Sequence, residues 1–262
     1  MTAGIWTERF RVRSYEITPR GTASVLALAD YLQEAAGHHA AELGVSMQDL
    51  LDDGRAWVLA RLRLDIDRLP KWEDDVVVET WPSGLDRLYA TREFVLHDGS
   101  DEGGVLARGT SAWLVIDTDR RRPLRPPAML RSLETPDRPP ALAHDVSRDL
   151  PAPERTDAAS TFTVRYHDLD VNRHVNNVRY LEWALETLPP EVLDARRCLS
   201  LQLQFSAETT LGDTVRATAQ IGNDPEGGPE GESLQVRHRL THAGDDRVLA
   251  TAATQWAPDG KA

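Results

Sequence analysis

The sequence contains a single cysteine, Cys198. One thiol excludes an internal disulfide and every metal site that is built from several cysteines. The histidines include the pair His38-His39, but no third ligand stands at a convincing spacing for zinc. Glycine-rich loops of the kind that bind nucleotide phosphates are also missing. We therefore expect neither a metal nor a cofactor.

Positive charge and long apolar runs are scarce as well. Lysine and arginine total 30 against 42 aspartates and glutamates, which gives a formal net charge of -12. An acidic chain is a poor partner for nucleic acid, because binding to phosphates needs a basic surface. No apolar run approaches the roughly 20 residues that a membrane helix needs, and residues 1–8 lack the apolar core of a secretory signal. Together with the single cysteine, these features predict a cytoplasmic protein without a membrane span.

What the chain does contain is a regular succession of strand and helix patterns. Alternating residues predict strands, and apolar residues that recur every three to four positions predict helices. In the first part of the chain the predicted strands are Phe10–Tyr15, Trp57–Ile66, Val76–Trp81, Tyr89–Leu96 and Val105–Ile116, and the predicted helices are Ala23–Leu43 and Met47–Leu51. Turn signals at Pro82-Ser83-Gly84 and His97-Asp98-Gly99 separate successive strands.

A segment without periodicity divides the chain. Residues 119–160 are rich in proline, arginine and aspartate, and only Ala128–Leu133 suggests short helical turns. We interpret this segment as a linker between an N-terminal domain, residues 1–118, and a C-terminal domain, residues 161–262.

The second part repeats the first in the same order. The corresponding pairs are Phe10-x-Val12-Arg13 with Phe162-x-Val164-Arg165, Tyr31-Leu32 with Tyr180-Leu181, Asp74-x-Val76 with Asp213-x-Val215, and Val105-Leu106-Ala107 and Trp113 with Val248-Leu249-Ala250 and Trp256. Such an ordered series indicates an internal duplication. Each half reads as a strand, a long helix and several antiparallel strands. The sequence thus favours an α+β fold in which each sheet curves around its own helix.

One stretch concentrates the polar chemistry. Residues 165–186 begin as the end of a strand, Phe162–Tyr166, and continue as an amphipathic helix over Val175–Leu188. Between them stand a histidine, carboxylates and amides: Asp168, Asp170, Asn172, His174, Asn176 and Asn177. Some of these are typical helix caps, but the set exceeds what a turn needs, and we interpret it as a functional site. The start of the helix would favour a developing oxyanion there.

The stretch D-L-D-V-N-R-H-V-N-N-x-x-Y, which begins at Asp168, resembles the signature of the acyl-acyl-carrier-protein thioesterases of plants and bacteria. The likeness extends from about Arg9 to Trp256. It includes Arg13-Ser14-Tyr15-Glu16-Ile17, Leu32-Gln33-Glu34-Ala35, Asp67-Arg68-Leu69-Pro70-Lys71-Trp72 and Thr80-Trp81-Pro82-Ser83. The resemblance implies a tandem, or double, hotdog fold. It also implies hydrolysis of acyl-carrier-protein thioesters, with the acylated carrier protein as substrate and partner.

The resemblance assigns catalytic roles to Asp170, Asn172 and His174, and to Glu208 on the strand that follows. Many plant members have cysteine directly after that glutamate, whereas this chain has Thr209. A cysteine nucleophile is therefore not expected. Glu208 or Asp170 would take a proton from water, His174 would orient the water or share that role, and Asn172 would hold the water or the carbonyl. Backbone N–H groups near Asn176 and Asn177 would stabilise the oxyanion.

The first half lacks these side chains at its own turn, so we expect it to supply the acyl pocket. The apolar candidates, for which plain core is the competing interpretation, are Leu28, Leu32, Trp57, Val58 and Leu59. A basic run is the candidate docking surface for an acidic carrier protein, with a solvated segment as the alternative: Arg120, Arg121, Arg122 and Arg125.

Other functions stay open at this stage. An acyl-CoA thioesterase would act on the same pantetheine thioester. A hotdog dehydratase, which also uses a histidine and a carboxylate, would not be expected to carry the D-x-N-x-H-V-N-N cluster. A non-catalytic acyl-binding protein would be expected to lack Asp170 or His174, and both are present. The sequence does not determine which acyl chain length is preferred. A homodimer is one of the oligomeric states that it allows.

Overall fold

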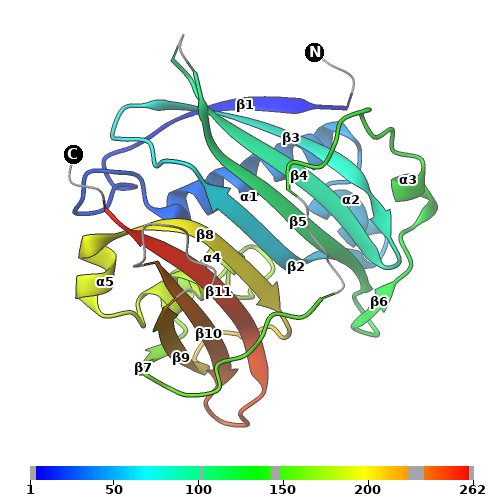
Figure 1. Ribbon diagram of the computed structural model, residues 1–262. Coiled ribbons are helices and arrows are strands. Elements are labelled where there is room, and N and C mark those ends of the chain that lie inside the picture. Colours follow the sequence, from blue (N-terminus) through cyan, green and yellow to red (C-terminus); the bar gives the residue numbers. More distant parts are fainter. Residues whose placement is uncertain (1–3, 101–102, 143–147, 224–232, 260–262) are drawn as a thin grey trace. The chain divides into compact units, whose positions relative to one another are not determined.

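The computed structural model describes residues 4–100, 103–142, 148–223 and 233–259 (Figure 1). The chain divides into two compact units, Met1–Val146 and Ser147–Ala262. The boundary falls inside the segment 119–160 that lacks periodicity. Within the described residues, no helix is long and apolar enough to cross a membrane.

The first unit is an antiparallel sheet in the order β1-β3-β4-β5-β2, with the short β6 paired to β5. Its elements are β1 (Trp6–Arg11), α1 (Val25–Glu42), α2 (Met47–Asp52), β2 (Arg55–Ile66), β3 (Asp75–Asp86), β4 (Tyr89–Asp98), β5 (Val105–Asp117), β6 (Arg122–Leu124) and α3 (Ala128–Arg131). The main helix, α1, packs against β3 and β1 (Figure 1).

The ends of α1 follow from local sequence. Ser24 caps the helix, since its hydroxyl accepts the N–H of Ala27 at 3.1 Å. Gly44, with a left-handed φ of 67°, follows the last turn, as the sequence predicts. Small side chains on the buried face let the helix approach the sheet closely. At Gly109 of β5 a Cβ atom would lie only 3.5 Å from Leu32 and 3.2 Å from the backbone of β2.

Two strand boundaries differ from the prediction. β1 ends at Arg11, because the N–H of Arg13 donates to the Glu16 carboxylate at 2.7 Å and closes a turn. The predicted turn at residues 82–84 is a bulge inside β3, where the register shifts between Pro82 and Gly84. Proline is tolerated at a bulge because it has no N–H to lose from the ladder. The chain reverses instead at Arg87, which has a φ of 53°.

The start of the predicted linker belongs to the first unit. β6 and α3 lie within residues 119–160, and α3 confirms the helical turns expected near Ala128. Leu130 of α3 joins a buried cluster with Val45, Leu50 and Val115. The short elements are stable because they cover this apolar cluster.

The second unit has the strand order β8-β11-β10-β9-β7, again antiparallel. Its elements are β7 (Ala158–Thr163), the 3₁₀ turn η1 (Tyr166–Asp168), α4 (Asn177–Leu185), α5 (Pro190–Ala195), β8 (Arg196–Phe205), β9 (Thr214–Asn223), β10 (Leu234–His242) and β11 (Val248–Pro258). α4 is shorter than the predicted helix Val175–Leu188. Val175 pairs with Leu169 in a bridge, and Pro189-Pro190 follows the other end.

Each unit contains the same backbone hydrogen bond at a corresponding position, which supports the duplication. Val12 donates its N–H to the carbonyl of Asp74 at 3.0 Å, and Val164 donates to the carbonyl of Asp213 at 2.9 Å. In both units, this hydrogen bond therefore connects the residue after the first strand to the turn before a later strand. Each unit is a hotdog, and the chain is an α+β tandem hotdog.

One predicted pair of the repeat is shifted. Phe10 stacks on Tyr31 with 4.6 Å between ring centroids, and Phe162 stacks on Trp183 with 5.8 Å. Tyr31 therefore corresponds to Trp183 and not to Tyr180. The sequence misleads here because Tyr180 and Trp183 are three residues apart, which is close to one helical turn. Aligning Tyr31 with either residue therefore keeps the apolar residues on the same face of the helix.

Candidate active site

The turn between β7 and α4 is shaped by Asp170. Its Oδ1 accepts the N–H of Asn172 at 2.8 Å and that of His174 at 3.2 Å. The N–H of Asp170 donates in return to the carbonyl of His174 at 2.8 Å. Arg173 completes the tight loop with a left-handed φ of 64°. Asp170 thus holds the turn that presents Asn172 and His174, and it does not cap the helix.

Asn176 caps α4 instead. Its side-chain oxygen accepts a backbone N–H of the first helical turn at 2.9 Å. The N–H of Asn176 donates to the carbonyl of Asp168 at 2.9 Å, and that of Val175 donates to the carbonyl of Thr209 at 3.1 Å. These two N–H groups are already bonded within the protein, which corrects the expectation that they face an oxyanion. Asn176 supports the turn, and the role of Asn177 stays a prediction.

His174 lies beside Glu208. Nε2 of the imidazole is 3.4 Å from Oε2 of the carboxylate, and the two side chains are 36% and 41% exposed. Glu208 lies on a loop beyond Phe205, the last residue of β8, whereas the sequence placed it on a strand. Partial exposure of both groups leaves room for a water molecule to reach them. The structure therefore brings together two of the groups that the sequence selected from distant positions.

Thr209 fixes the loop that carries Glu208. It is only 1% exposed, and its carbonyl accepts the N–H of Val175, next to His174. Its hydroxyl donates to Oδ2 of Asp213 at 2.7 Å. Because Thr209 follows Glu208 directly, these bonds also limit the orientation of the Glu208 backbone.

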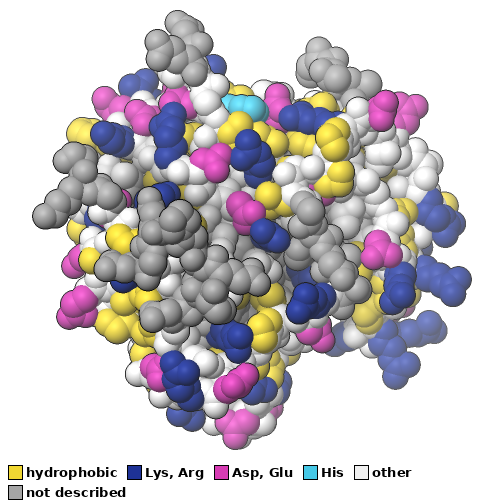
Figure 2. Space-filling model, in the orientation of Figure 1, with side chains coloured by type: hydrophobic (Ala, Val, Ile, Leu, Met, Phe, Trp, Pro, Cys, Tyr) yellow, Lys and Arg dark blue, Asp and Glu magenta, His cyan; other side chains and the backbone are white. Residues whose placement is uncertain are grey.

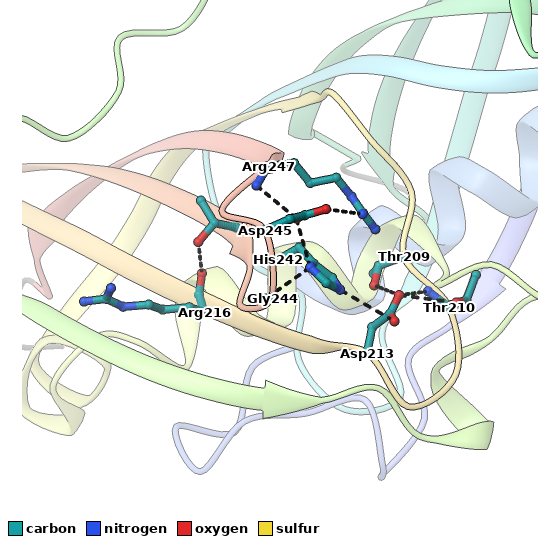
Figure 3. A network of polar contacts seen from close by, with 9 residues as sticks. Thr209, Thr210, Asp213, Arg216, His242, Gly244, Asp245 and Arg247 are labelled. Atoms are coloured by element: carbon teal, nitrogen blue, oxygen red, sulfur yellow. Dashed lines mark hydrogen bonds and ion pairs between the residues drawn. The ribbon is translucent and has the colours of Figure 1, made fainter.

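Asp213 is the centre of a wider polar network, which Figure 3 shows from close by. Its Oδ2 accepts the N–H of Thr210 at 2.8 Å, and its Oδ1 lies 3.6 Å from Nε2 of His242. His242 in turn lies 2.9 Å from Asp245, which Arg247 binds at 2.8 Å. The Thr210 N–H lowers the pKa of Asp213 most, and the Thr209 hydroxyl adds to that effect.

Tyr180 of α4 contributes a buried hydroxyl to the same region. Burial raises the pKa of Tyr180, although a hydrogen bond with the Thr209 backbone opposes that rise. The phenol therefore stays protonated at neutral pH.

Cys198 lies in β8, away from these groups in the sequence, and is 4% exposed. Burial raises the pKa of its thiol to about 12, and its Sγ contacts the Ser200 carbonyl at 3.4 Å. A thiol that stays protonated is a poor nucleophile. This environment fits the prediction that Cys198 is not catalytic.

The turn of the first unit has the same framework without the polar side chains. Thr18 donates its N–H to the carbonyl of Thr22 at 2.8 Å, and Gly21 there has a φ of 76°. These residues correspond to Asp170, His174 and Arg173. The duplication thus preserved the turn in both units, and only the second unit carries the carboxylate and imidazole.

The predicted pocket residues do not share one face. Leu28 and Leu32 of α1 and Leu59 of β2 are buried in the first unit, at 0%, 2% and 7% exposure. Trp57 is bound by its indole N–H to the carbonyl of Val45 at 2.9 Å and packs on the cluster around Leu130. Val58 lies between Trp57 and Leu59 on β2 and so points to the opposite face. The assignment of these five residues to one acyl pocket stays a prediction.

The predicted docking arginines are all exposed: Arg120, Arg121, Arg122 and Arg125. They surround β6, and Figure 2 shows Lys and Arg side chains gathered at the right-hand edge, where β6 lies in Figure 1. Beside them is a hollow of about 520 Å³. It is lined by Leu85, Arg87, Leu88, Arg125, Pro126 and Arg131. Leu85 and Leu88, which are 41% and 37% exposed, add apolar surface to a basic region.

The residues behind the site were not predicted from the sequence. Asp213 was expected only as the start of a strand, and His242 and Asp245 belong to no motif. The repeat nevertheless contains a signal: His242 occupies the position of Asp98, since the two pair with the corresponding Val215 and Val76. A histidine in place of an aspartate at an otherwise repeated position marks a divergence between the units.

Comparison with known proteins agrees with the fold and the sequence motifs. Residues 4–131 match the acyl-ACP thioesterase N-terminal domain, and residues 152–258 match the acyl-ACP thioesterase C-terminal domain. A palmitoyl-acyl carrier protein thioesterase of Cuphea hookeriana is 32% identical over 97% of this chain, and the match spans 62% of that relative. An oleoyl-acyl carrier protein thioesterase of Arabidopsis thaliana is 31% identical over 96% of this chain and 75% of its own length.

Among solved structures, the 12:0-ACP thioesterase of Umbellularia californica has a TM-score of 0.84 and 27% identity. The alignment covers 97% of this chain and 94% of that one. The chain thus spans less than two thirds of the first curated relative it matches, but nearly all of this solved structure. Since both halves match the family's domains in order, the chain belongs to the acyl-ACP thioesterase family.

Proposed function

We propose that this chain hydrolyses the thioester of fatty acyl-acyl carrier protein and releases free fatty acid and carrier protein. The observation that carries the proposal is the contact of His174 with Glu208 at 3.4 Å, on a turn that Asp170 holds in shape. Family membership supports the reaction class. Relatives named as acyl carrier protein thioesterases support the substrate class.

Glu208 is the proposed general base. It is partly exposed and lies against an imidazole, whereas Oδ1 of Asp170 already accepts two backbone N–H groups. Glu208 removes a proton from a water molecule, and the water oxygen attacks the thioester carbonyl carbon. The C–S bond then breaks, and the departing thiolate recovers a proton from the carboxylic acid of Glu208. His174 orients the water and shares the proton with Glu208.

Charge that develops on the carbonyl oxygen needs hydrogen-bond donors. The N–H groups of Val175 and Asn176 are bonded within the protein. We therefore assign this role to the side-chain amide of Asn172, with Asn177 as a further candidate. Asn172 lies two residues before His174 in the turn, and Asn177 lies three residues after it as the first residue of α4.

The first unit is the proposed acyl-binding half. Leu28, Leu32 and Leu59 are buried apolar side chains of that unit, and the corresponding turn lacks the imidazole and carboxylate pair.

The basic surface beside β6 is the proposed docking site for the acidic carrier protein. Its exposed arginines include Arg121 and Arg122, and the adjacent hollow offers apolar contacts through Leu85 and Leu88. A protein of net charge -12 repels another acidic protein at long range, so a local basic surface is needed for association. We place the reaction in the cytoplasm, on the composition of the sequence.

The test is release of free thiol from acyl-acyl carrier protein and from acyl-CoA, over a series of chain lengths. The proposal predicts a higher kcat/KM with the carrier-protein substrate at a given chain length. Preference for acyl-CoA would make the chain an acyl-CoA thioesterase, and absence of thiol release from either substrate would contradict the proposed function.

A further inference from the structure

We propose that His242 is a positioning residue, which bridges Asp213 and Asp245 and thereby holds the loop that carries Glu208 against His174. This inference rests on the proposed hydrolase function. It adds a second histidine, outside the family motif, to the residues that control the reaction.

Asp74 in the first unit and the corresponding Asp213 in the second differ in their contacts. In the first unit Asp74 accepts the N–H of Lys71 at 2.7 Å, as Asp213 accepts that of Thr210 at 2.8 Å. This bond is therefore part of the shared framework and says nothing about catalysis. In the second unit Asp213 also contacts a side chain on the neighbouring strand, His242, and the described residues of the first unit show no such contact for Asp74.

The extra contacts of the second unit come from two positions at which the first unit has different side chains. Where the second unit has Thr209, whose hydroxyl donates to Asp213, the first unit has Pro70, whose side chain cannot donate. Where the second unit has His242, the first has Asp98, which pairs with Arg68. The added links thus occur in the unit that carries the imidazole and carboxylate pair of the site.

The imidazole of His242 lies between two carboxylates (Figure 3). Nδ1 of His242 lies 2.9 Å from Oδ1 of Asp245, and Nε2 lies 3.6 Å from Oδ1 of Asp213. A neutral imidazole has one N–H, so it can donate to only one of these carboxylates. The imidazolium has two, and it bridges both.

Several other groups surround the imidazole of His242. Arg247 binds the far side of Asp245 at 2.8 Å and fixes its carboxylate. The N–H of Gly244 points at Nδ1 from 3.2 Å, a contact that the neutral imidazole accepts and the imidazolium does not. On β9 His242 pairs with Val215, and the side chain of Arg216, the next residue, points away from the imidazole in Figure 3. From α4 comes the phenol of Tyr180, which is neutral because burial raises its pKa.

Hydrogen bonds connect the bridge to the site. Asp213 binds the hydroxyl of Thr209, and the carbonyl of Thr209 binds the N–H of Val175, next to His174. Thr209 itself follows Glu208. Any movement of Asp213 therefore shifts the residue that sets the distance between Glu208 and His174.

The experiment compares His242→Gln, which has no charge, with His242→Arg, which carries donors on both sides at every pH. His97→Gln is the matched control, because His97 also lies near a carboxylate, 3.5 Å from Glu79, but in the first unit. The measurements are kcat and KM on acyl-acyl carrier protein, with the thermal unfolding midpoint of each variant.

We expect His242→Gln to lower kcat about tenfold with little change in KM, because the link between Asp213 and Asp245 is lost. His242→Arg should retain kcat within about threefold, because its guanidinium donates to both carboxylates, and it serves as the test if His242→Gln does not fold. A His242→Gln enzyme with unchanged kcat, or with kcat and KM changed alike, would overturn the inference. So would an inactive but folded His242→Arg. Absence of wild-type turnover in the same assay would instead contradict the proposed function.

Discussion

Thr22 in the first unit occupies the position of His174 in the second. The carbonyl of each accepts the N–H of the residue four positions earlier, Thr18 or Asp170, at 2.8 Å in both cases. The backbone of the turn therefore does not depend on the imidazole. Replacement of His174 should remove chemistry and leave the turn intact.

His174→Thr is the variant that this correspondence suggests. We expect kcat to fall by roughly 100-fold or more, the scale of lost acid–base assistance, with an unfolding midpoint close to that of the wild type. Thermal unfolding and thiol release from one preparation check both parts. A large loss of stability would show that the imidazole supports the turn after all.

Asp170 should behave differently, because its carboxylate binds two backbone N–H groups. Asp170→Ala leaves these donors without their partner and should lower the free energy of unfolding by about 1–3 kcal/mol. Asp170→Asn keeps an acceptor oxygen and should recover most of that stability. Denaturant unfolding of the two variants gives the comparison, and equal stability of both would mean that the turn is held by other contacts.

Arg173 has a left-handed φ of 64°, where the first unit has Gly21 at 76°. A side chain in this region costs about 1–3 kcal/mol in strain, whereas glycine adopts it freely. Arg173→Gly should therefore keep or raise the unfolding midpoint. A lower midpoint would indicate that the arginine side chain makes a stabilising contact larger than the strain.

The buried histidine of β10, His238, predicts a pH dependence of stability. It is 0% exposed, and burial lowers its pKa to about 4, below the unfolded value of about 6.5. Between these values the unfolded chain binds a proton that the folded chain does not, so stability falls as the pH falls from about 6.5 to about 4. The loss at pH 5 should be about 2 kcal/mol.

His238→Gln removes this proton uptake. Its unfolding free energy should therefore decrease less than that of the wild type between pH 7 and pH 5. Parallel urea titrations at the two pH values test this. An identical decrease in both proteins would assign the pH dependence to other groups, such as His39, whose pKa burial also lowers to about 4.

The docking surface is tested by charge reversal at Arg121 and Arg122. Their replacement by glutamate should raise KM for acyl-acyl carrier protein, most strongly at low salt, and leave a small pantetheine thioester unaffected. Arg11→Glu, an exposed arginine on β1 in the same unit, is the control. Equal changes with both substrates would show that the arginines support folding or the site.

The sequence predicted the elements better than their ends. The long helices and most strands follow from periodicity, because burial of one face repeats along an element. β1 and β7 end early because Glu16 and Asp168 accept the N–H groups of Arg13 and Arg165, each at 2.7 Å. A strand end that is set by a single side-chain hydrogen bond does not change the hydrophobic periodicity of the sequence.

Some residues of the candidate site could be predicted from the sequence, and others could not. Asp170, Asn172 and His174 are close in sequence, so the cluster is visible there. Glu208 is placed only by the resemblance to a family. The bridge from Asp213 to His242 connects residues of different elements and depends on strand register, which composition and spacing do not reveal.

The central claim is that Glu208 acts as the base for hydrolysis of an acyl-carrier-protein thioester. The most direct measurement is single-turnover release of free thiol by the wild type and by Glu208→Gln, with the unfolding midpoint of each. The account predicts a Glu208→Gln rate at least roughly 100-fold below the wild type and an unchanged midpoint. A folded Glu208→Gln enzyme with the wild-type rate would contradict it.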